Sequence, residues 1–134
     1  MAAVRELDQM LAQLRPRRHP GGYVFTMVPG TPPPGTRPVM TFAEDEGLTL
    51  VLRQDEADAA GLPYDLVTAW ITLSVHSALD GVGLTAAVSA ALAGAGISCN
   101  VVAAARHDHL FVPAAAAGEA IRLLTELSAR AAGR

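Results

Sequence analysis

Residues 69–104, which read AWITLSVHSALDGVGLTAAVSAALAGAGISCNVVAA, decide the fold of this chain. In Ala69–Val75, bulky apolar residues alternate with other side chains, and this period of two predicts a strand with one core-facing side. Val82–Ala95 is rich in Ala and Leu and closes on glycines, which predicts a helix and its C-terminal end. Ile97–Ala104 predicts a second strand. The loop His76–Gly81 joins the first strand to the helix, so the stretch is a strand–helix–strand unit.

The residues that follow extend this unit. Arg106–Asp108 is predicted to be a tight turn, His109–Val112 a returning strand, and Ala114–Ala131 a helix that opens after Pro113. The order β-α-β-β-α indicates an α+β sandwich of the ferredoxin-like type. That fold normally ends in a fourth strand, which is missing after the last helix. We therefore expect the fourth strand from the N-terminal part of the chain or from another subunit.

The N-terminal part is expected to be β-rich. In chain order the predicted elements are a helix at Val4–Leu14, a linker at Arg17–Gly22, a strand at Tyr23–Val28, a loop at 29–38, strands at Val39–Ala43 and Leu48–Leu52, and a helix at Asp55–Gly61. Five prolines make 29–38 a loop. The order β-loop-β-β-α resembles a degenerate copy of the C-terminal unit, with a loop in place of the first helix. We therefore predict two units, residues 1–65 and 66–134.

Composition excludes several classes of protein. The chain of 134 residues is 51% hydrophobic and 17% charged, with a net charge of −3. The basic cluster Arg15, Arg17 and Arg18 is short and is interpreted as a solvated helix end, so no nucleic-acid partner is predicted. Residues 66–105 carry one formal charge, but glycines and polar residues interrupt them, so no membrane span is predicted. The single cysteine, Cys99, allows no intrachain disulfide and suggests a reducing, cytoplasmic compartment.

Two adjoining segments carry a resemblance to a known family. Residues 79–88 (LDGVGLTAAV) and 92–102 (LAGAGISCNVV) resemble the ACT domain, in particular the ACT units of aspartate kinases and small stand-alone bacterial ACT proteins. Similar motifs in the latter group match 107–113 (HDHLFVP) and 41–50 (TFAEDEGLTL). The resemblance covers Val39–Leu127. It implies a ferredoxin-like ACT sandwich that binds an amino acid where the first strand turns into the helix, against the start of the next strand.

Carried over by position, the resemblance predicts a ligand site in two segments. Its residues are His76, Ser77, Leu79, Asp80, Gly81, Val82, Gly83, Ile97, Ser98, Asn100 and Val101. Physical reasoning from the residues points the same way, because glycines let the backbone approach a ligand and free helix N–H groups attract a carboxylate. Asp80 would pair with the ammonium group, and Asn100, as a buried amide, would need polar partners. The alternative is that Asp80 is only an N-cap and that the glycines only form the turn.

A metal site or an active site is not expected. His107 and His109 would share one face of a strand, but a closed metal site needs a third and usually a fourth ligand, and none is evident. No cofactor is predicted. A nucleophile with a positioned base is not recognisable either, so the chain is not expected to be an enzyme. A small enzyme that uses residues 107–109 is a weaker alternative.

The sequence therefore predicts an amino-acid-binding regulatory protein. Val82–Ala95 is too apolar for a solvated face, so we expect it to be covered on both sides in a homodimer or larger oligomer. The main alternative is a structural or adaptor protein that keeps the fold, has no small ligand, and binds a protein partner.

Overall fold

The computed structural model describes residue 3 and residues 6–134. They form two compact units. Unit 1 joins the described residues of Met1–His19 to Ala69–Arg134, and unit 2 is Pro20–Thr68. The N-terminal helix therefore packs with the C-terminal part of the chain, and unit 1 consists of two separate segments of the sequence. The predicted division into residues 1–65 and 66–134 instead placed this helix with the N-terminal unit.

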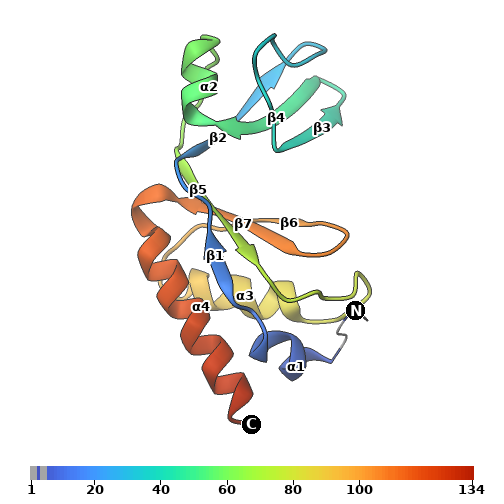
Figure 1. Ribbon diagram of the computed structural model, residues 1–134, viewed down its shortest axis with the longest axis vertical. Coiled ribbons are helices and arrows are strands. Elements are labelled where there is room, and N and C mark those ends of the chain that lie inside the picture. Colours follow the sequence, from blue (N-terminus) through green and yellow to red (C-terminus); the bar gives the residue numbers. More distant parts are fainter. Residues whose placement is uncertain (1–2, 4–5) are drawn as a thin grey trace. The chain divides into compact units, whose positions relative to one another are not determined.

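Unit 1 is a four-stranded sheet with helices on one face (Figure 1). Its strands lie in the order β1-β5-β7-β6. Its elements are α1 (Leu7–Ala12), β1 (Pro16–Arg18), β5 (Thr68–Leu73), α3 (Leu84–Ala93), β6 (Asn100–Ala103), β7 (Asp108–Pro113), the 3-10 helix η1 (Ala114–Ala116) and α4 (Ala117–Ala132). The predicted order β-α-β-β-α is confirmed. Within the described residues, no helix is both long enough and apolar enough to cross a membrane.

The fourth strand of unit 1 comes from the N-terminal part of the chain. Strand β1 pairs antiparallel with β5, in the register Arg17 to Thr72. The pairing is extended on one side by the His19 N–H, which donates to the Trp70 carbonyl at 2.9 Å. This finding decides between the two predicted sources of the strand.

Two predictions for this segment are wrong. The predicted linker Arg17–Gly22 begins inside strand β1. Helix α1 ends at Ala12, so Arg15, Arg17 and Arg18 do not form a helix end. The chain turns sharply at Arg15, which has a φ of 43°, and then enters the strand. The three arginines remain exposed, because β1 is an edge strand.

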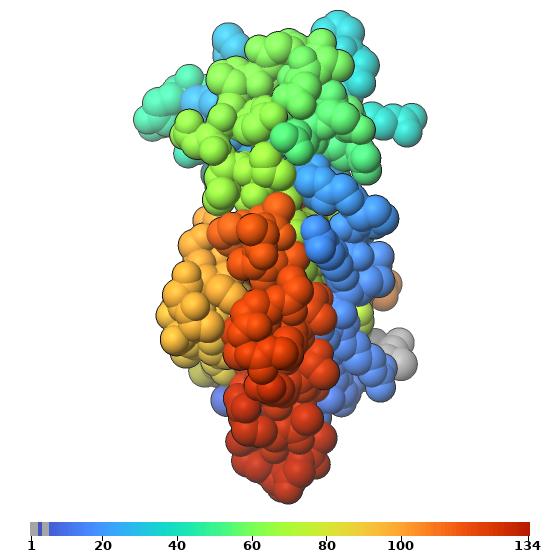
Figure 2. Space-filling model, turned by 90° about the vertical axis from the view of Figure 1, so that its left-hand side faces the viewer, coloured from blue at the N-terminus to red at the C-terminus, as the bar shows by residue number. Residues whose placement is uncertain are grey.

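The core of unit 1 lies between the sheet and helices α1, α3 and α4. Met10 and Leu14 from the N-terminal segment are fully buried there with Ile71, Leu110 and Leu124. Figure 2 shows α4 in red, flanked by the N-terminal segment in blue and by α3 in yellow and orange. The N-terminal segment is therefore an integral part of this core.

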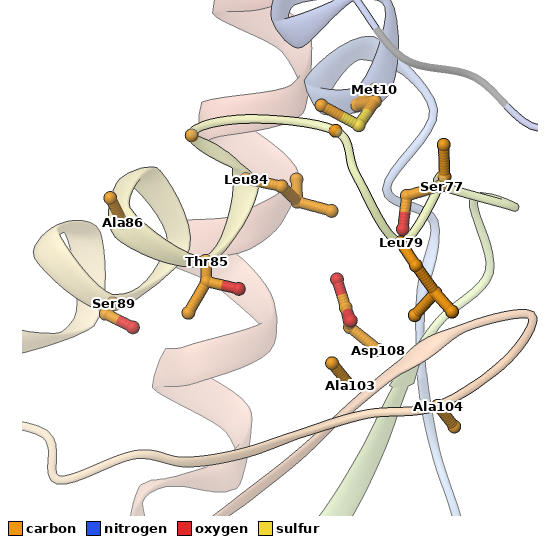
Figure 3. Close-up of a pocket in the computed structure, with 13 residues that line it drawn as sticks. Met10, Ser77, Leu79, Leu84, Thr85, Ala86, Ser89, Ala103, Ala104 and Asp108 are labelled. Carbon is orange, nitrogen blue, oxygen red and sulfur yellow. The ribbon is translucent and has the colours of Figure 1, made fainter.

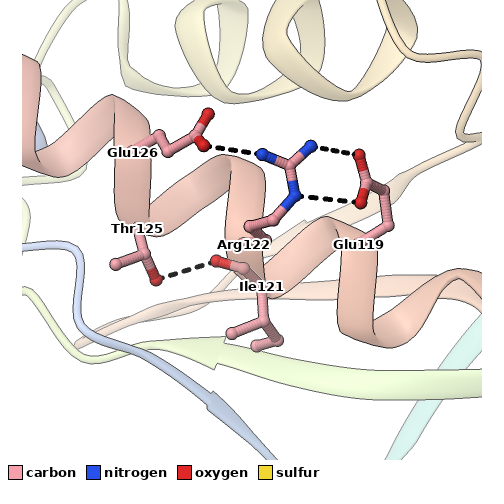
Figure 4. Close-up of polar contacts among 5 residues, drawn as sticks. All are labelled: Glu119, Ile121, Arg122, Thr125 and Glu126. Atoms are coloured by element: carbon pink, nitrogen blue, oxygen red, sulfur yellow. Dashed lines mark hydrogen bonds and ion pairs between the residues drawn. The ribbon is translucent and has the colours of Figure 1, made fainter.

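The outer faces of the helices differ in character. On α4, Arg122 bridges Glu119 and Glu126 one turn away on either side (Figure 4). These side chains are about half exposed, so the ion pairs add little stability and apolar packing holds the helix. On α3, Ala86 and Ala90 are exposed. One face of α3 is therefore left uncovered by the rest of the described chain. The expected cover on both sides would need a second molecule.

Unit 2 repeats the strand order of unit 1 with one helix missing. Its elements are β2 (Tyr23–Val28), β3 (Met40–Glu44), β4 (Gly47–Arg53) and α2 (Gln54–Ala59), with strand order β3-β4-β2. Thr68, the first residue of β5, completes the order by pairing with Tyr23, and its hydroxyl donates to the Tyr23 carbonyl at 2.7 Å. The proline-rich segment between β2 and β3 forms turns instead of a helix. The predicted degenerate copy is confirmed.

A polar network lies on the face of the unit 1 sheet opposite the helices. The His19 ring stacks on Trp70 with centroids 3.4 Å apart, and His19 Nε2 lies 2.7 Å from Thr72 Oγ1. Thr72 Oγ1 lies 3.0 Å from His109 Nδ1, which also accepts the Trp70 indole N–H at 3.1 Å. Because Nδ1 accepts, it must carry a lone pair, and the network requires a neutral His109.

The electrostatics of the network favour the same protonation state. Burial lowers the pKa of His19, and the positive charge of Arg17 lowers it further. Burial also lowers the pKa of His109, as does the neighbouring His107. Both imidazoles are therefore held neutral in the folded protein more strongly than in the unfolded chain.

The free energy of unfolding should fall as the pH is lowered from about 6.5. The unfolded histidines titrate near pH 6.5, whereas the folded pKa values are lower, so the network stabilises fully above about 6.5 and is lost as the pH falls through the folded values. In His109→Asn an amide oxygen keeps an acceptor, while the titrating imidazole is removed. Urea unfolding across this pH range should show a smaller loss in the variant than in wild type. Equal losses in the two proteins would contradict the role of His109.

Leu14→Ala should destabilise unit 1 by about 2–5 kcal/mol, because it empties a fully buried position. Urea unfolding followed by the fluorescence of Trp70, the only tryptophan, reports on unit 1. Phe42→Ala is the control, because this large apolar residue of unit 2 is 64% exposed and should change stability by no more than about 0.5 kcal/mol. A Leu14 variant as stable as wild type would show that the N-terminal segment is dispensable.

Candidate functional site

A cavity of about 460 Å³ lies in unit 1 at the N-terminal end of α3 (Figure 3). The loop after β5, the first turns of α3, helix α1 and the adjoining ends of β6 and β7 enclose it. Its lining residues are Met10, Ser77, Ala78, Leu79, Gly81, Gly83, Leu84, Thr85, Ala86, Ser89, Ala103, Ala104 and Asp108. Four residues of the predicted site, Ser77, Leu79, Gly81 and Gly83, are among them.

The glycines of the loop let helix α1 come close. A Cβ at Gly81 would lie 3.2 Å from the Met10 sulfur, and one at Gly83 would lie 3.2 Å from a methyl carbon of Leu7. Gly83 also has a φ of 100°, a left-handed conformation that glycine adopts without strain. The close approach expected of these glycines is therefore made to α1, which forms one wall of the cavity through Met10.

The N-terminus of α3 opens into the cavity. Gly83 is the N-cap residue and has no side chain to bond the free N–H groups, and the first turn holds no acidic residue. The Gly83 carbonyl accepts the Ala87 N–H at 2.9 Å, the first bond of the helical ladder. The N–H groups of Leu84, Thr85 and Ala86 precede that ladder, as the first N–H groups of any helix do, and so have no acceptor within α3. Because the helix dipole adds partial positive charge there, this end attracts anions.

Asp108 is the only charged residue that lines the cavity within the described part of the chain. It is the first residue of β7, its exposed fraction is 8%, and its carboxylate points into the hollow (Figure 3). No donor in the described part of the chain forms a hydrogen bond with this carboxylate. Burial raises the pKa of Asp108, although the nearby His109 and His107 act in the opposite direction. The cavity thus holds a largely buried carboxyl group that accepts no hydrogen bond from the described residues.

The structure brings together only part of the predicted site. Ser77, Leu79, Gly81 and Gly83 line the cavity. The other predicted residues do not line it; they are His76, Asp80, Val82, Ile97, Ser98, Asn100 and Val101. Asp80 and Ser98 are exposed, Ile97 is in the core, and Val101 packs against that core.

The prediction that Asn100 is a buried amide in an apolar strand is wrong. Strand β6 begins at Asn100, and the residue is exposed. An exposed amide is satisfied by water and needs no ligand.

Sequence reasoning missed Asp108 and the α3 residues that face it. Asp108 was assigned to a tight turn, whereas the structure places it in β7. A signal was present, because Asp108, Leu110 and Val112 are spaced by two residues and so share one face of a strand. The side chains of Leu110 and Val112 are fully buried, which indicates that Asp108 also points inward.

The two histidines beside Asp108 do not form a shared site. His107 precedes β7, its Nδ1 lies 3.2 Å from the Val75 carbonyl, and its ring lies 6.4 Å from that of His76. His109 instead joins the Trp70 and Thr72 network described above. Among the described residues, no group of three or more His, Cys, Asp or Glu side chains could hold a metal ion.

Comparisons with known proteins identify the family. Two family models described as ACT domains match residues 2–69 and 66–126. A crystal structure from Vibrio cholerae, described as a protein of unknown function and possible transport protein, is 43% identical with a TM-score of 0.82, over 91% of this chain and 95% of that one. No curated protein matches.

More distant structures share the fold. The regulatory subunit of aspartate kinase from Thermus thermophilus, in a ligand-free form, is 12% identical with a TM-score of 0.62, over 84% of this chain and 95% of that one. A protein from Agrobacterium tumefaciens is 24% identical with a TM-score of 0.60, over 81% and 84% of the two chains. With matches to both halves and a close relative over most of its length, the chain belongs to the ACT domain family and contains two ACT units in tandem.

Proposed function

We propose that this protein is a non-catalytic regulatory sensor that binds a free amino acid in the cavity of unit 1. One observation carries the proposal: the cavity has the N-terminus of α3 on one side and the buried Asp108 carboxylate on another. These are the two opposite polarities that a zwitterion requires. Membership of the ACT family and the likeness to a regulatory subunit of aspartate kinase support the same role.

The amino acid would lie with its carboxylate at the start of α3. The N–H groups of Leu84, Thr85 and Ala86 can donate to an anion, and the helix dipole favours negative charge at this end. The predicted role of the helix start is therefore kept, while its partner for the ammonium group changes from Asp80 to Asp108.

The ammonium group would pair with Asp108. An ionised carboxylate buried without a partner is costly, so a ligand cation that reaches it removes this cost. The Thr85 hydroxyl points across the cavity toward Asp108 and can complete the hydrogen bonds of the ligand (Figure 3). Bound ammonium would favour the ionised form of Asp108, opposing the effect of burial on its pKa.

The proposal includes no catalytic step. Ser77 lines the cavity, but neither His76 nor His107 does, so among the described lining residues no imidazole accompanies its hydroxyl. Cys99 is a free cysteine outside the cavity, and burial raises its thiol pKa to about 11, which keeps it protonated and unreactive near neutral pH. A protonated free thiol also fits the proposed cytoplasmic location.

We also propose that the protein acts as a homodimer. The exposed surface of α3 carries small uncharged side chains at Ala86, Ala90 and Ala93, and a second copy could pack closely on it. A protein partner on this surface is the alternative that corresponds to the adaptor hypothesis.

Asp108→Asn should abolish amino-acid binding without unfolding the protein. A thermal-shift screen with each common amino acid should identify a ligand of wild type. At a hundred times its dissociation constant this ligand adds about 2.7 kcal/mol of stability, which is a melting shift of roughly 5–15 °C. The variant should lose the shift. Without ligand it should be at least as stable as wild type near neutral pH, because it removes a desolvated charge.

Two further aspartate variants test the assignment of Asp108. Asp45→Asn, in the exposed turn between β3 and β4 of unit 2, is the matched control and should keep the full shift. Asp80→Asn tests the assignment made from the sequence. Loss of the shift with Asp80→Asn but not with Asp108→Asn would restore that assignment. No shift with any amino acid in wild type would favour the adaptor hypothesis.

Light scattering on purified protein tests the proposed dimer. At micromolar concentration the mass should be about twice the 13.9 kDa of one chain. Ala90→Arg places a long charged side chain on the exposed surface of α3 and should shift the mass to that of the monomer, because burying an unpaired charge in an interface is costly. A monomeric wild type, or a variant that remains dimeric, would show that this surface is not the interface.

A further inference from the structure

We infer that the cavity of unit 1 selects amino acids with uncharged, apolar side chains, and that Leu79 and Val82 pack over that side chain in the bound state. This inference rests on the proposed function and deepens it by naming the class of ligand. Three features of the cavity carry it: its charges, its lining and the exposure of its loop.

Within the described residues, the charges that line the cavity match those of a zwitterion. Asp108 is the only charged side chain in this part of the lining, and the ammonium group of the ligand would use it. A second cation on the ligand would then find no further anion among the described lining residues. A second carboxylate would lie in a cavity that already holds Asp108 and, among the described lining residues, has no basic side chain. Burying either unpaired charge opposes binding.

The remaining lining combines apolar side chains with three hydroxyl groups. Met10, Leu79 and Leu84 contribute large apolar side chains, and alanines at positions 78, 86, 103 and 104 contribute small ones; the hydroxyl groups belong to Ser77, Thr85 and Ser89. An aliphatic or thioether side chain buries apolar surface against this lining, whereas a polar one would lose hydrogen bonds to water. Once the head group is placed, the lining favours ligands such as leucine or methionine.

The loop exposes apolar surface at the rim of the same cavity. Leu79 is 74% exposed and Val82 is 81% exposed, and they are the most exposed large hydrophobic residues of the described chain. Leu79 also lines the cavity, where it extends beside Asp108 toward the β6–β7 end (Figure 3). Val82 does not line the cavity but lies in the loop between Gly81 and Gly83, which do. Exposed apolar side chains in this loop would lose contact with water if they packed over an apolar ligand.

Calorimetric titration with glycine, leucine, methionine, glutamate, lysine and arginine tests the selectivity. Glycine carries the two head-group charges without a side chain and so measures them alone. Leucine and methionine should bind at least about tenfold more tightly than glycine, from the apolar surface that they bury. Glutamate, lysine and arginine should bind more weakly than leucine.

Variants of the loop test the role of its exposed side chains. Leu79→Ser and Val82→Ser should each weaken leucine binding several-fold while leaving glycine binding unchanged. Phe42→Ser is the matched control, because Phe42 is an exposed apolar residue of unit 2, and it should leave both affinities unchanged.

The outcomes separate this inference from the proposed function. Tightest binding of arginine, lysine or glutamate, or equal binding of glycine and leucine, would overturn the selectivity and leave amino-acid binding intact. Absence of binding by every amino acid would overturn both. If the loop variants change the mass in light scattering but not the affinity for leucine, a second copy of the chain covers Leu79 and Val82, and the inference about these residues is wrong.

Discussion

The pairing of β1 with β5 is the constraint on which unit 1 depends. The backbone bonds from His19 to Trp70 and from Ser74 to Leu14 fix the N-terminal segment along the edge of the sheet. This placement carries α1 onto the core, where Met10 is buried against the loop that precedes α3. A wall of the candidate site is therefore built by Met10, which lies far in the sequence from the other residues that line the cavity.

Most of the fold could be predicted because burial imposes a period on the sequence. Ile71 and Leu73 point into the core from β5, and Leu84, Val88 and Leu92 do so from α3, so both elements were found within two residues of their ends. Strand β1 could not be found in this way. Its sequence, Pro-Arg-Arg, has no apolar alternation because it is a short edge strand, and only pairing with a distant segment makes it a strand.

The site was predicted less well than the fold, because burial of a polar side chain is a tertiary property. The resemblance predicted a ligand site at the glycine loop and the start of the helix, and the cavity lies at these two elements. The two polar partners chosen from the sequence, Asp80 and Asn100, are exposed. Asp108 was assigned to a turn because aspartate is common in turns, yet the strand begins one residue earlier than expected and turns its carboxylate inward. Side chains alternate along a strand, so the extension of β7 to Asp108 places this residue on the inward side with Leu110 and Val112.

The chain leaves unit 1 after His19 and returns to it at Ala69, beside the point of departure. In topological terms β1 and β5 are the two arms of one β-hairpin, and all of unit 2 stands where its turn would be. The ends of unit 2 also meet, since Tyr23 pairs with Thr68. A domain inserted in this manner can change in length or be replaced without disturbing the register of the arms. Because His19 lies opposite Trp70, replacement of residues 20–69 by a two-residue Asn-Gly turn would thus give a continuous single-domain protein whose sheet keeps all four strands.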